Sequence, residues 1–227
     1  MRHGFVKVAA VTPKIKVADT SYNGELIRKL MKKTAKAGAK VVVFPELCIT
    51  GYTCSDLFLQ EKLLTSALDE LVKISECSQN IDGIFFVGLP LEINGKLYNV
   101  AAAVSGGDIL GIVPKQYLPN YNEFYEKRWF SSARELSTDH IYASELLGSV
   151  ECDYDIPLGN NLIYHLPDAF CFGAEICEDL WAPIPPSAFM AMSGAELILN
   201  LSASNDTIGK REYREKLVKE KSTSLMC

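Results

Sequence analysis

The order of the secondary-structure patterns changes near residue 80, and this change limits the folds open to the chain. Before it, apolar strand-like runs alternate with segments of helical periodicity. After it, three apolar runs follow one another across the turn pairs Asn94-Gly95 and Gly106-Gly107, which favour tight hairpins. Strand–helix–strand units give parallel strands, whereas hairpins give antiparallel ones. The sequence therefore predicts an α/β fold with mixed sheets.

The first part of the chain contains two strand-like and two helix-like segments. Strands are predicted over 5–11 and 41–44, and the second is wholly apolar, as expected of a strand covered on both faces. Helices are predicted over 22–37 and 60–77 from the spacing of their apolar residues, with Gly38 placed to end the first.

The later part combines regular and irregular stretches. Residues 115–168 are irregular, polar and aromatic, which is typical of a functional region or an insertion. The regular elements predicted here are strands over 84–93, 96–104, 109–115, 169–177 and 196–202, and helices over 187–193 and 210–221. The last helix has no cap, Gly or Pro before the final residue. We therefore expect one domain over 1–227 that is a fragment of a longer protein and lacks the last elements of its fold.

Composition excludes several classes of protein. With 227 residues, of which 48% are hydrophobic, the chain can bury a large core. A net charge of −5 disfavours binding to nucleic acid or to an anionic membrane, and no apolar run reaches the roughly 18 residues of a membrane span. Seven cysteines without a Cys-x-x-Cys pair indicate reduced thiols and a cytoplasmic protein, and no His/Cys pair has zinc spacing.

Three predicted strands end in a reactive side chain: Glu46, Lys115 and Cys177. Ligands of open α/β folds bind at the carboxyl ends of strands, so these three ends can converge. A carboxylate can take the proton of a thiol as sulfur attacks a carbonyl carbon. An ammonium and the backbone N–H after the cysteine would stabilise the oxyanion. This set predicts hydrolysis of an amide through a thioester.

Each of these residues also has an ordinary structural interpretation. A cysteine at the end of an apolar strand is most often a packing residue, Lys115 can be solvated, and Glu46 can cap a helix. The run from Ser105 to Asp108 is interpreted as a hairpin turn rather than a phosphate-binding loop.

Three blocks of sequence, at 44–52, 113–130 and 172–181, together resemble the nitrilase superfamily of carbon–nitrogen hydrolases. The resemblance implies a four-layer αββα sandwich with mixed sheets. It also implies a catalytic triad of Glu46 as general base, Lys115 as transition-state stabiliser and Cys177 as nucleophile.

Residues 118–130, with ICEDLW and NLSASN further on, most resemble the N-terminal glutaminase domain of glutamine-dependent NAD synthetases. The resemblance implies that glutamine is the substrate and that ammonia passes to a synthetase domain of the same polypeptide, which amidates deamido-NAD. ATP and Mg are expected only in that second domain, and no cofactor or metal in this one. Homo-oligomers are expected from the same resemblance.

The resemblance also implies roles around the triad. Glu126 would orient the lysine, with Glu123 left open as the alternative. The implied substrate-binding residues are Glu178 for the α-amino group, Tyr121 and Ser204 around the amino-acid head, Tyr52 and Trp181 as aromatic walls, and Lys210 for the carboxylate.

Two other functions stay open at this stage. One is a stand-alone amidase or nitrilase that acts on another small amide. The other is a catalytically inactive assembly domain, which a missing triad member would indicate.

Overall fold

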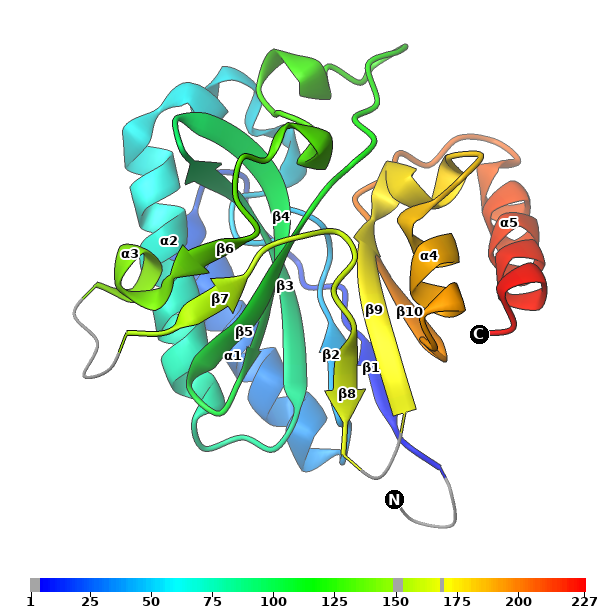
Figure 1. Ribbon diagram of the computed structural model, residues 1–227. Helices are drawn as coiled ribbons and strands as arrows, with labels where there is room; N and C mark the ends of the chain where they lie inside the picture. The colour runs from blue at the N-terminus through cyan, green and yellow to red at the C-terminus, as the bar shows by residue number, and fades with distance from the viewer. Residues whose placement is uncertain (1–4, 149–152, 168–169) are drawn as a thin grey trace.

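The computed structural model describes residues 5–148, 153–167 and 170–227 (Figure 1). Its larger sheet has five strands in the order β1-β2-β3-β4-β5. Strands β1, β2 and β3 are parallel, whereas β4 pairs antiparallel with both β3 and β5, so the predicted mixed sheet is confirmed. The strands are Val8–Ala10, Val41–Val43, Ile84–Ile93, Lys96–Ser105 and Asp108–Pro114.

The two hairpins lie where the turn pairs predicted them. Asn94 and Gly95 have φ of +50° and +74°, and Gly106 and Gly107 have +64° and +96°. Positive φ at both central residues matches the right-handed twist of the flanking strands. These turns therefore set the register of the central strands.

A second sheet contains β8 (Tyr164–Leu166), β9 (Phe170–Ile176) and β10 (Leu197–Leu201). β9 is parallel to β10 and antiparallel to β8. The segment predicted to be irregular also holds a small hairpin, formed by β6 (His140–Tyr142) and β7 (Asp155–Pro157), with the short helix α3 (Ala143–Leu147) between them.

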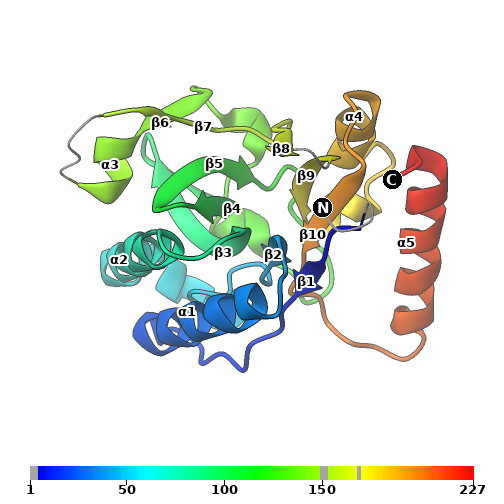
Figure 2. The same ribbon diagram turned by 90° about the horizontal axis from the view of Figure 1, so that it is seen from below.

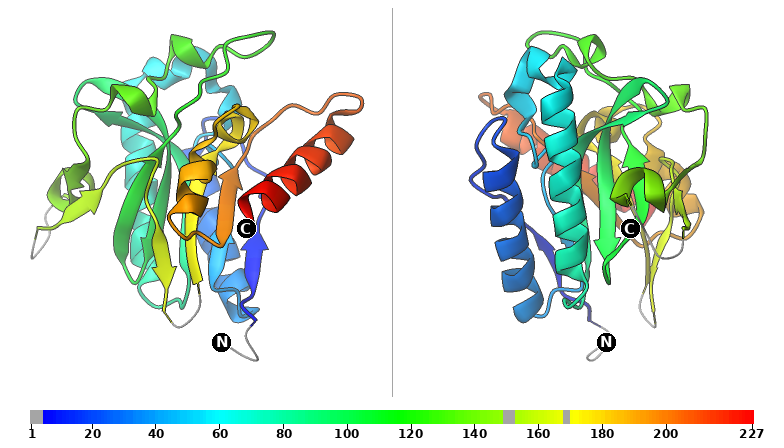
Figure 3. Two further views of the ribbon diagram at one scale, coloured as in Figure 1. Left: turned by 45° about the vertical axis from the view of Figure 1, so that its right-hand side comes forward. Right: turned by 90° about the vertical axis from the view of Figure 1, so that its left-hand side faces the viewer.

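Helices cover the outer faces of both sheets. Figure 2 shows α1 (Thr20–Lys36) and α2 (Glu61–Ser78) against the larger sheet, and α4 (Pro186–Met192) and α5 (Lys210–Leu225) beyond the second. Figure 3 shows the same layers from the side. The predicted αββα sandwich is thus confirmed.

Alternate residues of the central strands belong to two separate hydrophobic cores, one on each face of the larger sheet. Phe85 and Val87 of β3 point toward α1 and α2, whereas Phe86 packs between the sheets, with its ring 6.0 Å from that of Phe172. Successive side chains of a strand point to opposite faces, so one buried strand serves both cores. This explains why β3 is apolar at nearly every position.

Several boundaries differ from those predicted. The first strand is only Val8–Ala10 because its partner β2 has three residues. Helix α1 begins at Thr20, since Asp19 accepts a hydrogen bond from the backbone N–H of Tyr22 (3.1 Å) and caps the first turn. Gly38, with φ of +86°, follows its end as predicted, and the charged last helix continues to Leu225.

The described residues contain no helix both long and apolar enough to cross a bilayer. The six cysteines among them are free thiols, and Cys152 lies outside the described residues.

Candidate active site

The three reactive residues lie at strand ends, as predicted. Glu46 follows β2 and Lys115 follows β5, both in the larger sheet, whereas Cys177 follows β9 in the second sheet. Cys177 has φ of +47°, a left-handed conformation that costs a non-glycine residue energy and is concentrated at functional sites. The site is therefore assembled where the two sheets face each other.

Lys115 lies between two buried carboxylates. Its Nζ is 2.6 Å from Oε1 of Glu46 and 2.6 Å from Oε1 of Glu126. The side chains of all three residues are essentially inaccessible to solvent. Burial lowers the pKa of Lys115, but the charges of the two carboxylates outweigh this effect and raise the pKa overall. The ammonium therefore stays charged at neutral pH.

The carboxylate of Glu46 is held by three donors. Oε1 accepts from Lys115 and from the side-chain amide of Asn99 (2.7 Å), and Oε2 accepts from the backbone N–H of Ala203 (3.0 Å). A carboxylate has about four lone-pair sites, two on each oxygen. Oε1 is saturated, so the free site of Glu46 lies on Oε2.

A glycine in β3 permits the position of Glu46. The chain turns over β3 directly after Glu46, where Leu47 has φ of +50° and Ile49 donates its N–H to the carbonyl of Gly88 (3.1 Å). A Cβ at Gly88 would lie 2.4 Å from the backbone nitrogen of Leu47. Only glycine allows this approach without displacement of the turn.

Glu126, rather than Glu123, contacts the lysine. Its Oε1 also accepts from the hydroxyl of Tyr52 (2.8 Å), and its Oε2 has no hydrogen-bond partner among the described residues. Burial raises the pKa of Glu126 to about 7, opposed by the positive charge of Lys115. Glu123 is exposed and bonds Asn205 instead.

The thiol of Cys177 is buried and close enough to the cluster to respond to its charges. Burial raises its pKa to about 12, the charge of Glu46 adds to this effect, and the charge of Lys115 opposes it. Such a thiol is neutral at pH 7 and needs a base to react.

The remaining predicted residues form the more exposed side of the site. The hydroxyl of Tyr121 lies 2.9 and 3.0 Å from the carboxylate oxygens of Glu178. The ammonium of Lys210 lies 5.5 Å from the ring centre of Trp181, which stacks on Tyr213 with ring centres 5.4 Å apart. An anion and a cation thus flank this side of the site.

Ser204 lies in the segment between β10 and α5 and is half-buried. Its neighbours Ala203 and Asn205 bond Glu46 and Lys210, so this segment connects Glu46 to the exposed side.

Two polar residues of the site went unnoticed in the sequence. Asn99 is a buried amide within the apolar run of β4, and Asp179 is a buried acid two residues after Cys177. Burial raises the pKa of Asp179 to about 7, although backbone N–H groups of Tyr117 and Ile176 donate to it. A polar residue inside a buried run was the available signal for Asn99.

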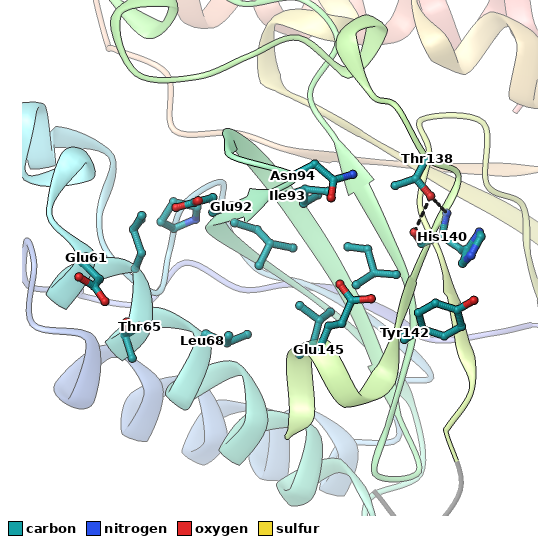
Figure 4. Close-up of a pocket in the computed structure, with 15 residues that line it drawn as sticks. Glu61, Thr65, Leu68, Glu92, Ile93, Asn94, Thr138, His140, Tyr142 and Glu145 are labelled. Atoms are coloured by element: carbon teal, nitrogen blue, oxygen red, sulfur yellow. Dashed lines mark hydrogen bonds between the residues drawn. The ribbon is translucent and has the colours of Figure 1, made fainter. Parts of the chain in front are cut away.

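A separate cleft of about 350 Å³ lies between α2, the β3–β4 turn and the β6–α3 segment. Figure 4 shows Glu61, Glu92 and Glu145 around it, with His140 at one side. None of the ten predicted site residues lines it, so it is distinct from the candidate active site.

Residues 7–217 match the model of the carbon–nitrogen hydrolase family. The chain belongs to this family. Its assignment to the superfamily from three short blocks is therefore confirmed.

This carbon–nitrogen hydrolase is similar to much longer proteins. It is 36% identical over 228 residues to a glutamine-dependent NAD(+) synthetase of Mycobacterium tuberculosis, covering all of this chain and 32% of that protein. It is 30% identical over 211 residues to the Aquifex aeolicus protein of the same name, covering 93% of this chain and 32% of that protein. The chain thus spans about a third of the length of these relatives.

Solved structures agree with the fold. A crystal structure of a glutamine-dependent NAD(+) synthetase from Cytophaga hutchinsonii matches with a TM-score of 0.80 and 30% identity, over 98% of this chain and 34% of that one. An amidase of the nitrilase superfamily from Nesterenkonia matches with a TM-score of 0.75 and 16% identity, over 99% and 74% of the two chains. The match to the amidase, at this low sequence identity, shows a shared fold only.

Proposed function

We propose that this carbon–nitrogen hydrolase releases ammonia from the side-chain amide of glutamine, as the glutaminase domain of a glutamine-dependent NAD synthetase. The observation that carries the proposal is the buried Glu46–Lys115–Glu126 cluster beside Cys177. It combines a base, a fixed cation and a nucleophile in one site.

In the first step, Glu46 acts as general base. The Cys177 thiol is neutral at pH 7, so proton removal accompanies attack. Oε2 of Glu46, which keeps a free lone pair, takes the thiol proton as Sγ bonds to the amide carbon. The C=O electron pair moves onto oxygen and forms an oxyanion.

Lys115 and the backbone N–H of Glu178 would stabilise that oxyanion. The ammonium is already oriented by two carboxylates and stays charged, so it needs little reorganisation when the negative charge forms. Loss of one such donor typically slows a reaction by about 100- to 1,000-fold.

Collapse of the intermediate breaks the C–N bond. Glu46 returns its proton to the leaving nitrogen, ammonia departs, and a thioester of Cys177 remains. Water then loses a proton to Glu46 and attacks the thioester carbon through a second oxyanion. The C–S bond breaks, the Cys177 thiolate takes back the proton held by Glu46, and glutamate leaves.

The charged groups on the exposed side suit free glutamine, which is a zwitterion. Glu178, held by Tyr121, would bind the α-ammonium, and Lys210 the α-carboxylate. Ser204 would contact the same amino-acid head, and Trp181 would form a wall of the pocket. The hydroxyl of Tyr52, expected as another wall, has a second role in its bond to Glu126.

The rest of the activity belongs to a longer polypeptide. We propose that the ammonia amidates deamido-NAD in a synthetase domain that binds ATP and Mg, in a cytoplasmic homo-oligomer. The relatives named glutamine-dependent NAD(+) synthetase, about three times as long as the chain, support the part of this proposal that concerns a synthetase domain. We propose no cofactor or metal for the present domain.

The proposal is tested by ammonia release from glutamine and from a simple aliphatic amide by the full-length protein. We expect turnover of glutamine, its loss in Cys177→Ala, and retention of synthesis from added ammonia in that variant. Cys171→Ala is the matched control, since Cys171 lies on β9, the strand that Cys177 follows.

Two results would contradict the proposal. Turnover of the aliphatic amide but not of glutamine would indicate a stand-alone amidase. Turnover of neither, with Cys177 alkylated no faster than Cys171, would indicate an inactive assembly domain.

A further inference from the structure

Asp179 joins the two sheets at the active site. Its carboxylate is about 1% exposed and accepts four hydrogen bonds from backbone N–H groups. Gln116 donates to Oδ1 and Oδ2 at 3.1 and 3.4 Å, Tyr117 donates to Oδ1 at 2.7 Å, and Ile176 donates to Oδ2 at 3.1 Å. One side chain thus holds residues from both halves of the sandwich.

The donors are the neighbours of two residues in the reaction. Gln116 and Tyr117 directly follow Lys115 at the end of β5, and Ile176 directly precedes Cys177 at the end of β9. β5 and β9 belong to different sheets. The bonds of Asp179 therefore fix the position of the lysine segment relative to the cysteine segment.

A carboxylate suits this position better than an amide would. The three backbone groups are all donors, and they favour the ionised aspartate, which accepts on both oxygens, although burial opposes ionisation by raising the pKa of Asp179. Asparagine would present an NH₂ group to at least one of them. That N–H would be buried without an acceptor, and an unpaired buried donor lowers the stability of the folded state.

We propose that Asp179 is a positioning residue that sets the placement of the Lys115 ammonium relative to the Cys177 sulfur. Its effect on glutamine turnover rests on the proposed function, whereas its effect on the reactivity of the thiol does not. Catalytic rates are sensitive to such placement, since a displacement of about 1 Å in a reacting group can lower the rate about 100-fold.

The alternative is a purely structural role, in which Asp179 only caps the short turn Cys177–Trp181. Loss of a cap lowers thermal stability but does not change the chemistry of a correctly folded molecule. The two roles therefore differ in the reactivity of Cys177 at temperatures well below unfolding.

The experiment compares the full-length wild-type protein with Asp179→Asn, Asp179→Ala and Asp179→Glu. Glu70→Gln is the matched control, because Glu70 is also a buried acid but bonds Arg28 and Lys73 in the outer helical layer. Iodoacetamide alkylation of Cys177 is measured by peptide mass spectrometry relative to Cys77 in the same molecule. Melting temperature, kcat and KM for glutamine are measured in parallel.

We expect alkylation of Cys177 relative to Cys77 to fall about 10-fold or more in Asp179→Asn, and further in Asp179→Ala, which keeps no acceptor. Asp179→Glu retains both oxygens and should recover part of the rate. In glutamine turnover kcat should fall with little change in KM. Glu70→Gln should lower the melting temperature without changing the alkylation ratio or kcat.

A structural role would give a different result. If Asp179→Asn lowers the melting temperature but keeps the alkylation ratio within about twofold of wild type, the positioning role is wrong. If Asp179→Ala does not fold, Asp179→Asn and Asp179→Glu decide the question. A wild-type protein that alkylates fast at Cys177 but releases no ammonia from glutamine would contradict the proposed function instead.

Discussion

Nζ of Lys115 lies 2.6 Å from Oε1 of Glu126, and both side chains are shielded from solvent. Removing such a charged pair from water costs free energy, so a protein keeps a buried pair where its geometry has a function. Here the charge of Glu126 raises the pKa of Lys115 and so helps to keep its ammonium protonated.

The first prediction concerns Glu126→Gln. The negative charge of Glu126 raises the pKa of Lys115, so its removal lowers that pKa. We expect kcat for glutamine to fall about 100-fold and the alkaline limb of the pH–rate profile to move to lower pH. Glu123→Gln is the control, since this exposed residue bonds Asn205. Equal effects of the two variants would contradict the assignment.

The second prediction concerns stability against pH. Burial raises the pKa of Glu126 to about 7, above the value of an unfolded glutamate of about 4.3. The folded state therefore binds the extra proton, and this stabilisation is complete below pH about 4 and is lost as pH rises through about 7. Asp179 contributes in the same direction.

Denaturant unfolding between pH 5 and 8 measures this effect. We expect the free energy of unfolding of the wild-type protein to fall by on the order of 1–3 kcal/mol over this range, and less in Glu126→Gln. Glu123→Gln should follow the wild type. Parallel curves for Glu126→Gln and the wild type would show that Glu126 does not titrate in this window.

The third prediction concerns Gly88→Ala. The added methyl group would overlap the turn that carries Glu46, so we expect a loss of about 1–3 kcal/mol in stability together with a loss of activity. Gly95→Ala is the matched glycine variant, with a positive φ in a distant turn and open space around it. The Gly95→Ala variant should lose about 1–2 kcal/mol in its free energy of unfolding and should keep its activity. Denaturant unfolding and ammonia release measure the two effects.

The fourth prediction concerns Lys210→Ala. If Lys210 binds the carboxylate of glutamine, its loss should raise KM about 10-fold and leave kcat nearly unchanged. Arg211→Ala removes the neighbouring charge, whose guanidinium faces Glu215 on the helix surface, and should change neither constant. A drop in kcat without a change in KM would assign Lys210 to the reaction rather than to substrate binding.

Sequence reasoning could find the three candidate catalytic residues because Glu46, Lys115 and Cys177 each stand at or just after the end of a buried strand. Periodicity and turn pairs also predicted the mixed sheet, since β3, β4 and β5 are long and closely connected. The partners of the triad were harder to find. Asn99 reaches Glu46 only through the register between neighbouring strands, and Asp179 meets the residues after Lys115 only when the two sheets pack. Contacts between distant segments leave no periodic signal.

The division of the triad between two sheets bears on how the molecule matures. The strands that carry Glu46 and Lys115 precede Cys177 in the chain and can pair before the second sheet exists. The sulfur of Cys177 comes near Glu46 only when the two sheets pack together. In a chain whose sheets have not yet packed, Cys177 is therefore separated from Glu46 and Lys115, and under the proposed function such a chain releases no ammonia.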